Sequence, residues 1–270
     1  MRSLRSLTTP YLVWMVILIL IPGLFILLAT LSTFHIFNAY TFRFTAAHLG
    51  FLTDEIFIRA LRNSLKYAGI TTIICFLIGY PVAHFFAKME SRSKTLFVAL
   101  LIVPVWSNMI VRIIAWESMF KPVSILNLFG LSFDLIGTDL AIVTAMVSMY
   151  LPFMIFPIYS VLLKLDESLI EASRDLGANR FQTFIRVTFP LSLGGVISGI
   201  IMTLLPAMTA FALPKRIGGD GTLLLGVVIE EQIFRGSFNI AATVSLIVMI
   251  LMLTAFALII RVDKEGETLL

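Results

Sequence analysis

The sequence predicts an all-α integral membrane protein with six transmembrane helices and one long polar segment between the fourth and the fifth. Of the 270 residues, 59% are hydrophobic and 13% are charged, whereas soluble domains have about 45–50% apolar and about 25% charged residues. The apolar runs approach the roughly 20 residues that a spanning helix needs. They are too long for ordinary strands, so the expected fold is helical throughout.

The six spans are expected within one transmembrane domain that covers residues 1–270. Their predicted ranges are 11–34, 65–87, 96–120, 140–163, 191–213 and 240–260. The first run exceeds the about 7–15 apolar residues of a signal-peptide core, so we expect an uncleaved span. Residues 56–65 carry Arg59 and Arg62 between apolar positions, which indicates a short helix in the membrane interface.

The distribution of Lys and Arg predicts which side of the membrane each loop faces. The short loop at 88–94 contains Lys88, Arg92 and Lys94, and positive charge in short loops favours the cytoplasmic side. Both chain ends and the polar segment at 164–190 then face the cytoplasm. The last outer loop, at 215–237, is Gly-rich and then mildly apolar, so it either re-enters the membrane or packs on it.

The polar segment predicts two short helices joined by a corner. Ser168 and Glu171 have the spacing of a capping box, so a helix is expected to begin at Ser168. Gly177 stands where that helix should end, because glycine enters the left-handed region without steric cost. Asn179 can cap the second helix, and Pro190 suits the entry to the fifth span.

This helix–Gly–helix segment has the shape of an element that a partner protein can grip. Leu165, Leu169, Ala172 and Leu176 are expected to share one face of the first helix, with charged residues on the other. A helix with apolar anchors and a polar rim fits into a groove of a partner.

Several spans contain helix-breaking or small residues. Proline removes a helical hydrogen bond and kinks the segment, and such breaks tend to be buried or to line a cavity. Prolines interrupt the third span at Pro104, the fourth at Pro152 and Pro157, and the fifth at Pro206. Gly195 and Gly199 form a small-xxx-small face, which predicts close packing against another helix.

Polar and aromatic residues within the spans are candidates to line a substrate path. The candidates are Trp106, Asn108, Arg112, Tyr150 and Phe211. An arginine in a span costs about 2.5–3.5 kcal/mol on insertion scales, so Arg112 should meet a partner or a wet cavity. Three candidates have a structural alternative: Tyr150 and Phe211 as packing groups, and Arg112 as a hydrogen-bond hub or a snorkelling side chain.

Other functional classes lack their motifs. The chain has no GxxxxGK[ST] loop, no paired histidine ligands and no G-x-S-x-G elbow. No catalytic residue, metal site or bound cofactor is therefore expected. Cys75 is the single cysteine, so no disulfide within the chain is possible. The positive net charge is attributed to membrane topology and not to nucleic-acid binding.

The polar segment also carries a pattern of fixed spacing. Glu171, Ala172 and Ser173 are followed after three residues by Gly177, and after nine more by Val187, Thr188, Phe189 and Pro190. This pattern resembles the EAA signature of permease subunits of binding-protein-dependent ABC importers, whose usual form is Glu-Ala-Ala, three residues, Gly, nine residues and Ile-x-Leu-Pro. The segments at 79–88, 100–116, 150–192 and 205–219 are similar to the spermidine/putrescine type of this family.

The resemblance implies a set of partners in the bacterial cytoplasmic membrane. They are a second permease subunit in a heterodimer, a cytoplasmic ABC ATPase dimer that hydrolyses ATP with Mg, and an extracytoplasmic substrate-binding protein. It further implies that the two short helices dock in the ATPase and couple hydrolysis to alternating access. The residues that it assigns to coupling are Glu171, Ala172, Ser173, Arg174, Asp175, Gly177 and Pro190.

Other functions remain as alternatives. The polyamine assignment rests on similarity, because the third to fifth spans contain few acids for a polycation, and Lys215 and Arg216 follow the fifth. A permease for a small anion, an amino acid or another cation is the nearest alternative. An intramembrane enzyme would need a polar pair or metal cluster in a cavity, and a scaffold would need no broken spans.

Overall fold

The computed structural model describes residues 2–33, 43–89, 91–122, 134–219 and 222–262. In these ranges the chain forms helices and one isolated bridge between Ser32 and Phe44. The α-helices are α1 (Arg2–Thr30), α2 (Glu55–Ala87), α3 (Ser91–Trp106), α4 (Met109–Phe120), α5 (Asp139–Leu163), α6 (Glu167–Asp175), α7 (Arg180–Thr183), α8 (Phe189–Leu191), α9 (Leu193–Met208), α10 (Ala212–Ile217), α11 (Leu225–Phe234) and α12 (Phe238–Val262). A 3-10 helix, η2, covers Ala47–Thr53, and a π-helix, η4, covers Phe184–Thr188.

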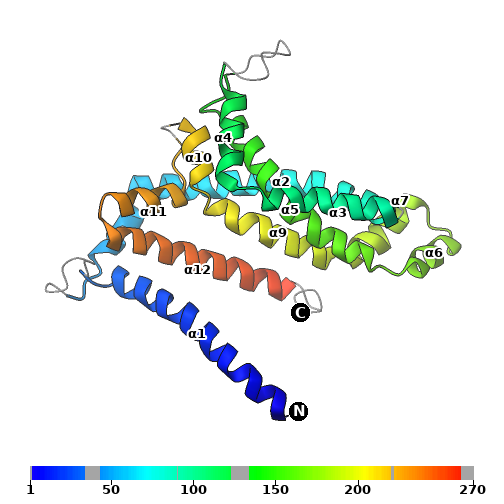
Figure 1. The fold of residues 1–270 in the computed structure, drawn as a ribbon, viewed down its shortest axis with the longest axis horizontal. Helices are drawn as coiled ribbons and strands as arrows, with labels where there is room; N and C mark the ends of the chain where they lie inside the picture. Colours follow the sequence, from blue (N-terminus) through cyan, green and yellow to red (C-terminus); the bar gives the residue numbers. More distant parts are fainter. Residues whose placement is uncertain (1, 34–42, 90, 123–133, 220–221, 263–270) are drawn as a thin grey trace.

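Four of the described helices are long and apolar enough to cross a membrane, and the count rises to 6 if each of two bent pairs is one span. The all-helical membrane class is therefore confirmed. The helices α2, α5 and α9 pack against one another and form the main core (Figure 1). In the same view α6 and α7 lie at the right-hand end of the bundle, and α11 lies at the opposite end.

Small residues let α9 approach α5 closely, as the sequence predicts. A Cβ atom at Gly195 would lie 2.8 Å from the carbonyl oxygen of Pro157. A Cβ atom at Gly199 would lie 2.8 Å from the Sδ of Met154 and 2.9 Å from its carbonyl oxygen. Both distances are shorter than van der Waals contact, so the two helices would have to move apart to admit a side chain.

We therefore expect Gly199→Ala to destabilise the protein by about 1–3 kcal/mol, the usual cost of overpacking a close contact. Gly69→Ala on α2 is the matched control, because its Cβ meets no atom within 4 Å. The control should be neutral or slightly stabilising, since alanine is the better helix former. Thermal unfolding of the detergent-purified variants measures both effects, and equal melting temperatures would contradict the close packing.

The predicted third span, 96–120, is broken into two helices. Its halves, α3 and α4, meet at an angle of 90°. Pro104 lies inside the last turn of α3, and Asn108 starts α4 because its side chain accepts a 2.8 Å hydrogen bond from the N–H of Ile110. A proline followed by a strong N-cap ends one helix and begins another.

The predicted fifth span, 191–213, also differs from the structure. Most of this range forms α9, which ends at Met208. A separate helix, α10, starts at Ala212. The preceding helical stretch, Arg180–Leu191, meets α9 at 62°. The hydropathy of residues 209–213 gave no sign of this second break.

The interfacial helix expected at 56–65 does not exist as a separate element. Residues 55–87 form one helix, α2, of 33 residues, capped by Asp54. Phe57 and Ala60 are buried in a second hydrophobic cluster with residues of α11 and α12. This packing holds residues 56–65 in the bundle as the first part of α2. α11, which lies in the stretch at 215–237, packs against α2 and α12 in the same cluster.

Candidate functional site

The first helix of the polar segment, α6, begins earlier than the spacing of Ser168 and Glu171 predicts. Asp166 is its N-cap and accepts a 2.9 Å hydrogen bond from the N–H of Ser168. This bond holds the pKa of the Asp166 carboxyl below its usual value. The predicted capping box is therefore wrong. Leu165 is partly buried against the main core, which fixes where the chain leaves α5 and leaves Asp166 at the cap.

The corner after α6 is the one that the sequence predicts. Gly177 has φ of +83°, a conformation that costs other residues about 1–2 kcal/mol. The N–H of Gly177 donates to the carbonyl oxygen of Arg174 at 2.8 Å, and the N–H of Ala178 donates to that of Ser173 at 3.1 Å. This pair of bonds is the Schellman motif, which satisfies the last carbonyl groups of a helix.

Asn179 caps the second helix, as predicted, and together with Gln182 it forms a capping box that was not predicted. The side chain of Asn179 accepts from the N–H of Gln182 at 2.8 Å, and the Gln182 side chain accepts from the N–H of Asn179 at 2.9 Å. The helix then widens into η4, where the N–H of Phe189 donates to the carbonyl oxygen of Phe184. Pro190 follows directly, and a wider turn accommodates a residue that has no N–H.

Two hydrogen bonds attach these short helices to each other and to the bundle. The hydroxyl groups of Ser173 and Thr183 lie 2.9 Å apart and join α6 to α7. The hydroxyl groups of Tyr80 and Ser192 lie 2.8 Å apart and join α2 to the bend before α9. Ser173 therefore faces inward, and the segment from α6 to α9 is connected by side chains as well as by the backbone.

The segment exposes several apolar and charged side chains. Leu176 is 90% exposed and Phe181 is 69% exposed. Leu169 and Ile185 are each about half exposed. Glu171 and Asp175 are also exposed. Large apolar side chains with a charged rim are the composition of a protein-binding surface.

Arg112, in the second half of the broken third span, donates hydrogen bonds to two backbone carbonyl groups. One of its guanidinium nitrogens donates to the carbonyl oxygen of Pro104 at 3.2 Å and the other to that of Ser148 at 2.9 Å. The Ser148 carbonyl lacks its ordinary helical donor, because the residue four positions later is Pro152. Arg112 thus satisfies one carbonyl group at the break between α3 and α4 and one that Pro152 leaves free within the continuous helix α5. This is the hydrogen-bond hub among the sequence alternatives.

We expect Arg112→Gln to destabilise the protein by about 1–3 kcal/mol, because the partly buried carbonyl group of Ser148 loses a hydrogen bond from a charged donor. Arg112→Lys should recover only part of the loss, since an ammonium lacks the planar fork of donors. Arg62→Gln, at an exposed position of α2, is the control. Thermal unfolding in detergent is the measurement. A melting temperature that falls no further for Arg112→Gln than for Arg62→Gln would exclude this role.

The structure does not gather the other candidates for a substrate path around Arg112. Trp106 is 86% exposed beside the exposed cap Asn108. Tyr150 is buried, and its hydroxyl donates to the carbonyl oxygen of Pro206 at 3.3 Å. Phe211 is about half exposed before α10. Four cavities around α2, α6, α7 and α9 are lined by other residues.

Ion pairs at the end of the bundle opposite α6 were not foreseen from the sequence. Glu117 pairs with Lys121 at 2.8 Å and with Arg216 at 3.0 Å, which joins α4 to α10. Lys215 pairs with Glu230 at 2.8 Å and joins α10 to α11. Glu117 and Lys121 have the local i,i+4 spacing, whereas Arg216 and Glu117, and Lys215 and Glu230, are too far apart in the sequence for a local pattern to indicate them.

Comparison with known proteins identifies relatives along nearly all of the chain. Residues 58–264 match the family model described as "Binding-protein-dependent transport system inner membrane component". The spermidine/putrescine transport system permease protein PotB of Haemophilus influenzae is 36% identical over 250 residues, which cover 89% of this chain and 87% of the relative. PotB of Escherichia coli is 36% identical over 254 residues, which cover 90% of this chain and 92% of the relative.

Solved structures show the same fold. The crystal structure of a bacterial alginate ABC transporter in complex with an alginate pentasaccharide-bound periplasmic protein contains a similar chain, with a TM-score of 0.75. The match covers 98% of this chain and 96% of the other at 16% sequence identity. At this identity the likeness concerns the fold.

Proposed function

The chain belongs to the family of binding-protein-dependent transport system inner membrane components, and from this premise we propose that it carries spermidine and putrescine into the bacterial cytoplasm. It acts as one permease subunit of an ABC importer and is driven by ATP that a partner subunit hydrolyses with Mg. The observation that carries the coupling part of this proposal is the exposed unit of α6, Gly177 and α7. The substrate follows from the two PotB relatives.

The exposed unit is the docking element for the ATPase. Glu171 and Asp175 supply the charged rim, and Leu176 and Phe181 supply apolar anchors. Gly177 sets the corner, and Ser173 ties the two helices together through Thr183. Ala172, Arg174 and Pro190 complete the set. Closure of an ATPase dimer can move such a unit as a rigid body and switch a two-state membrane domain.

A second permease subunit covers the break between α3 and α4. Non-helical backbone at membrane depth is tolerated where protein or a water-filled cavity surrounds it. Ser107 and Asn108, at the 90° bend, are exposed in this chain together with Trp106. A partner that packs here would enclose the bend and complete a path between the two subunits, with Trp106, Asn108 and Phe211 as candidates to line it.

The segment with α6 and α7 faces the cytoplasm, as the Lys and Arg distribution favours. Both chain ends are then cytoplasmic, and α4, α10 and α11 are on the side of the extracytoplasmic substrate-binding protein. In Figure 1, α1 begins and α12 ends on the side toward α6, in agreement with this arrangement.

The charges along the chain bear on the cargo. Lys215 is ion-paired with Glu230. Arg216 shares Glu117 with Lys121, so these three side chains together keep one net positive charge. Glu117 is likewise paired, and it is the only acid within α3, α4 and α9. Carboxylates for a polycation are therefore expected on the partner subunit, with aromatic faces supplied by this chain.

Substrate-stimulated ATP hydrolysis by the purified complex with its binding protein tests the cargo. The panel is spermidine, putrescine, amino acids and small anions at matched ionic strength. We expect stimulation by the two polyamines. Stimulation by another solute with none by polyamines would refute the cargo and retain the transport architecture.

A further inference from the structure

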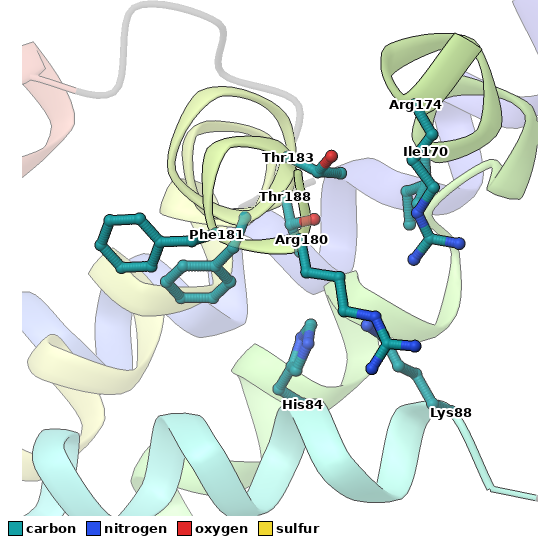
Figure 2. A pocket seen from close by; sticks show the side chains of 9 residues that line it. His84, Lys88, Ile170, Arg174, Arg180, Phe181, Thr183 and Thr188 are labelled. Carbon is teal, nitrogen blue, oxygen red and sulfur yellow. The ribbon is translucent and has the colours of Figure 1, made fainter. Parts of the chain in front are cut away.

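A basic pocket lies between the end of α2 and the unit formed by α6 and α7. Its volume is about 590 Å³. Its cationic lining residues come from three elements, with Lys88 after α2, Arg174 on α6 and Arg180 on α7. Figure 2 shows the side chains of Lys88, Arg174 and Arg180 converging on one space, with His84 at its floor.

The positive charge in this pocket is not balanced by its own lining, which contains no acid. Among the described residues, no ion pair involves Lys88, Arg174 or Arg180. Burial lowers the pKa of Lys88, and Arg174 and Arg180 lower it further, while Glu167 acts in the opposite direction. Repulsion among cations held together in this way is relieved by a bound anion.

An apolar cavity of about 440 Å³ adjoins the basic pocket. The two share His84, Lys88 and Phe184, and the apolar one continues along α2 past Tyr80 and Phe85. A ligand that fills both spaces has an anionic group joined to a hydrocarbon part. A phospholipid has this composition, whereas free phosphate or a nucleotide does not.

The depth of the pocket agrees with such a ligand. Lys88 immediately follows Ala87, the last residue of the spanning helix α2. This is the level at which a span leaves the hydrocarbon and where lipid phosphates lie. Basic pockets between transmembrane helices are known to hold anionic headgroups.

We propose that this pocket binds the phosphate group of an anionic phospholipid, with an acyl chain of the lipid in the adjoining apolar cavity. The assignment to the cytoplasmic leaflet rests on the proposed function. Because Arg174 and Arg180 belong to α6 and α7, the bound lipid braces the unit that docks the ATPase. Lipid composition is then a regulator of coupling.

Lipid retention by the purified complex tests the proposal without any transport assay. The complex is delipidated in detergent, mixed with phosphatidylglycerol or phosphatidylcholine, and examined by native mass spectrometry. We expect selective retention of phosphatidylglycerol. Lys88→Gln together with Arg180→Gln should weaken it about 30-fold, at about 1 kcal/mol for each cation. Arg186→Gln, an exposed cation of η4 outside this pocket, is the control.

The other outcomes contradict the proposal in distinguishable ways. Equal retention in the double variant and in Arg186→Gln would exclude this pocket as the lipid site. Displacement of phosphatidylglycerol by millimolar inorganic phosphate would assign the pocket to a free anion. If the double variant binds lipid normally but associates more weakly with the ATPase, the pocket would instead bind a carboxylate of the ATPase. If the double variant does not assemble, Lys88→Gln alone should show about a fivefold loss.

This result is independent of the cargo. Lipid retention with no polyamine stimulation would refute the proposed substrate and leave the lipid site intact. Polyamine stimulation with no selective lipid retention would do the reverse.

Discussion

Replacing Gly177 with proline is expected to abolish uptake while the membrane helices remain inserted. Proline fixes φ near −65°, whereas Gly177 has φ of +83°. It also lacks the N–H that Gly177 donates to the carbonyl oxygen of Arg174. The Schellman corner cannot form, so α6 and α7 lose their mutual orientation. Uptake of labelled substrate in proteoliposomes measures the effect, and we expect it to fall at least 100-fold.

Two further substitutions at Gly177 separate backbone strain from steric clash. A Cβ atom there meets nothing within 4 Å, so alanine introduces only the conformational cost of about 1–2 kcal/mol. Asparagine visits the left-handed region more readily. The expected order of uptake is glycine, asparagine, alanine and then proline. Full uptake by Gly177→Pro, at equal abundance of the complex, would show that this corner has no role in coupling.

Reversing the charge of Glu171 is expected to uncouple ATP hydrolysis from transport. Glu171 is exposed on α6, on the surface proposed to enter the ATPase. A lysine there keeps the helix, because both residues are good helix formers. It places a like or unpaired charge in a buried interface, which costs several kcal/mol. We expect uptake to fall at least tenfold while basal ATP hydrolysis continues without substrate stimulation.

The matched control for Glu171→Lys is Glu55→Lys. It makes the same charge reversal at an exposed glutamate that is the first residue of α2. Glu171→Gln distinguishes loss of charge from reversal and should be milder than Glu171→Lys. Parallel assays of uptake and hydrolysis on the same preparation are required. A Glu171→Lys complex that couples as well as Glu55→Lys would remove Glu171 from the docking surface.

Local features of the polar segment could be predicted from the sequence because short-range contacts determine them. The conformation of Gly177 and the cap at Asn179 depend on residues within one helical turn. The start of α6 was placed incorrectly because two capping patterns compete within three residues. The position of Leu165 against the core favours Asp166, and this contact is not visible in the local sequence.

Long-range features could not be predicted in the same way. Charges at Arg59 and Arg62 suggested a separate interfacial helix, but α11 and α12 pack against this stretch and make it part of α2. The role of Arg112 depends on Ser148, which the fold brings beside it. Pro152 alone gave a clue, because a proline always frees the carbonyl four residues earlier. The basic pocket joins Lys88 to Arg174 and Arg180, which are remote in the sequence.

Cross-linking from Leu176 tests most directly whether α6 and α7 dock the ATPase. Cys75 is buried and is replaced by alanine to leave a single reactive thiol. Leu176→Cys places that thiol at the corner, and Phe234→Cys, at a 79% exposed position at the end of α11, is the control. The thiol is labelled with benzophenone-4-maleimide, which on illumination inserts into a nearby C–H bond of any protein. An adduct with the ATPase subunit should form from position 176 and not from position 234. An adduct from position 234 alone, in an intact complex, would contradict the proposed coupling.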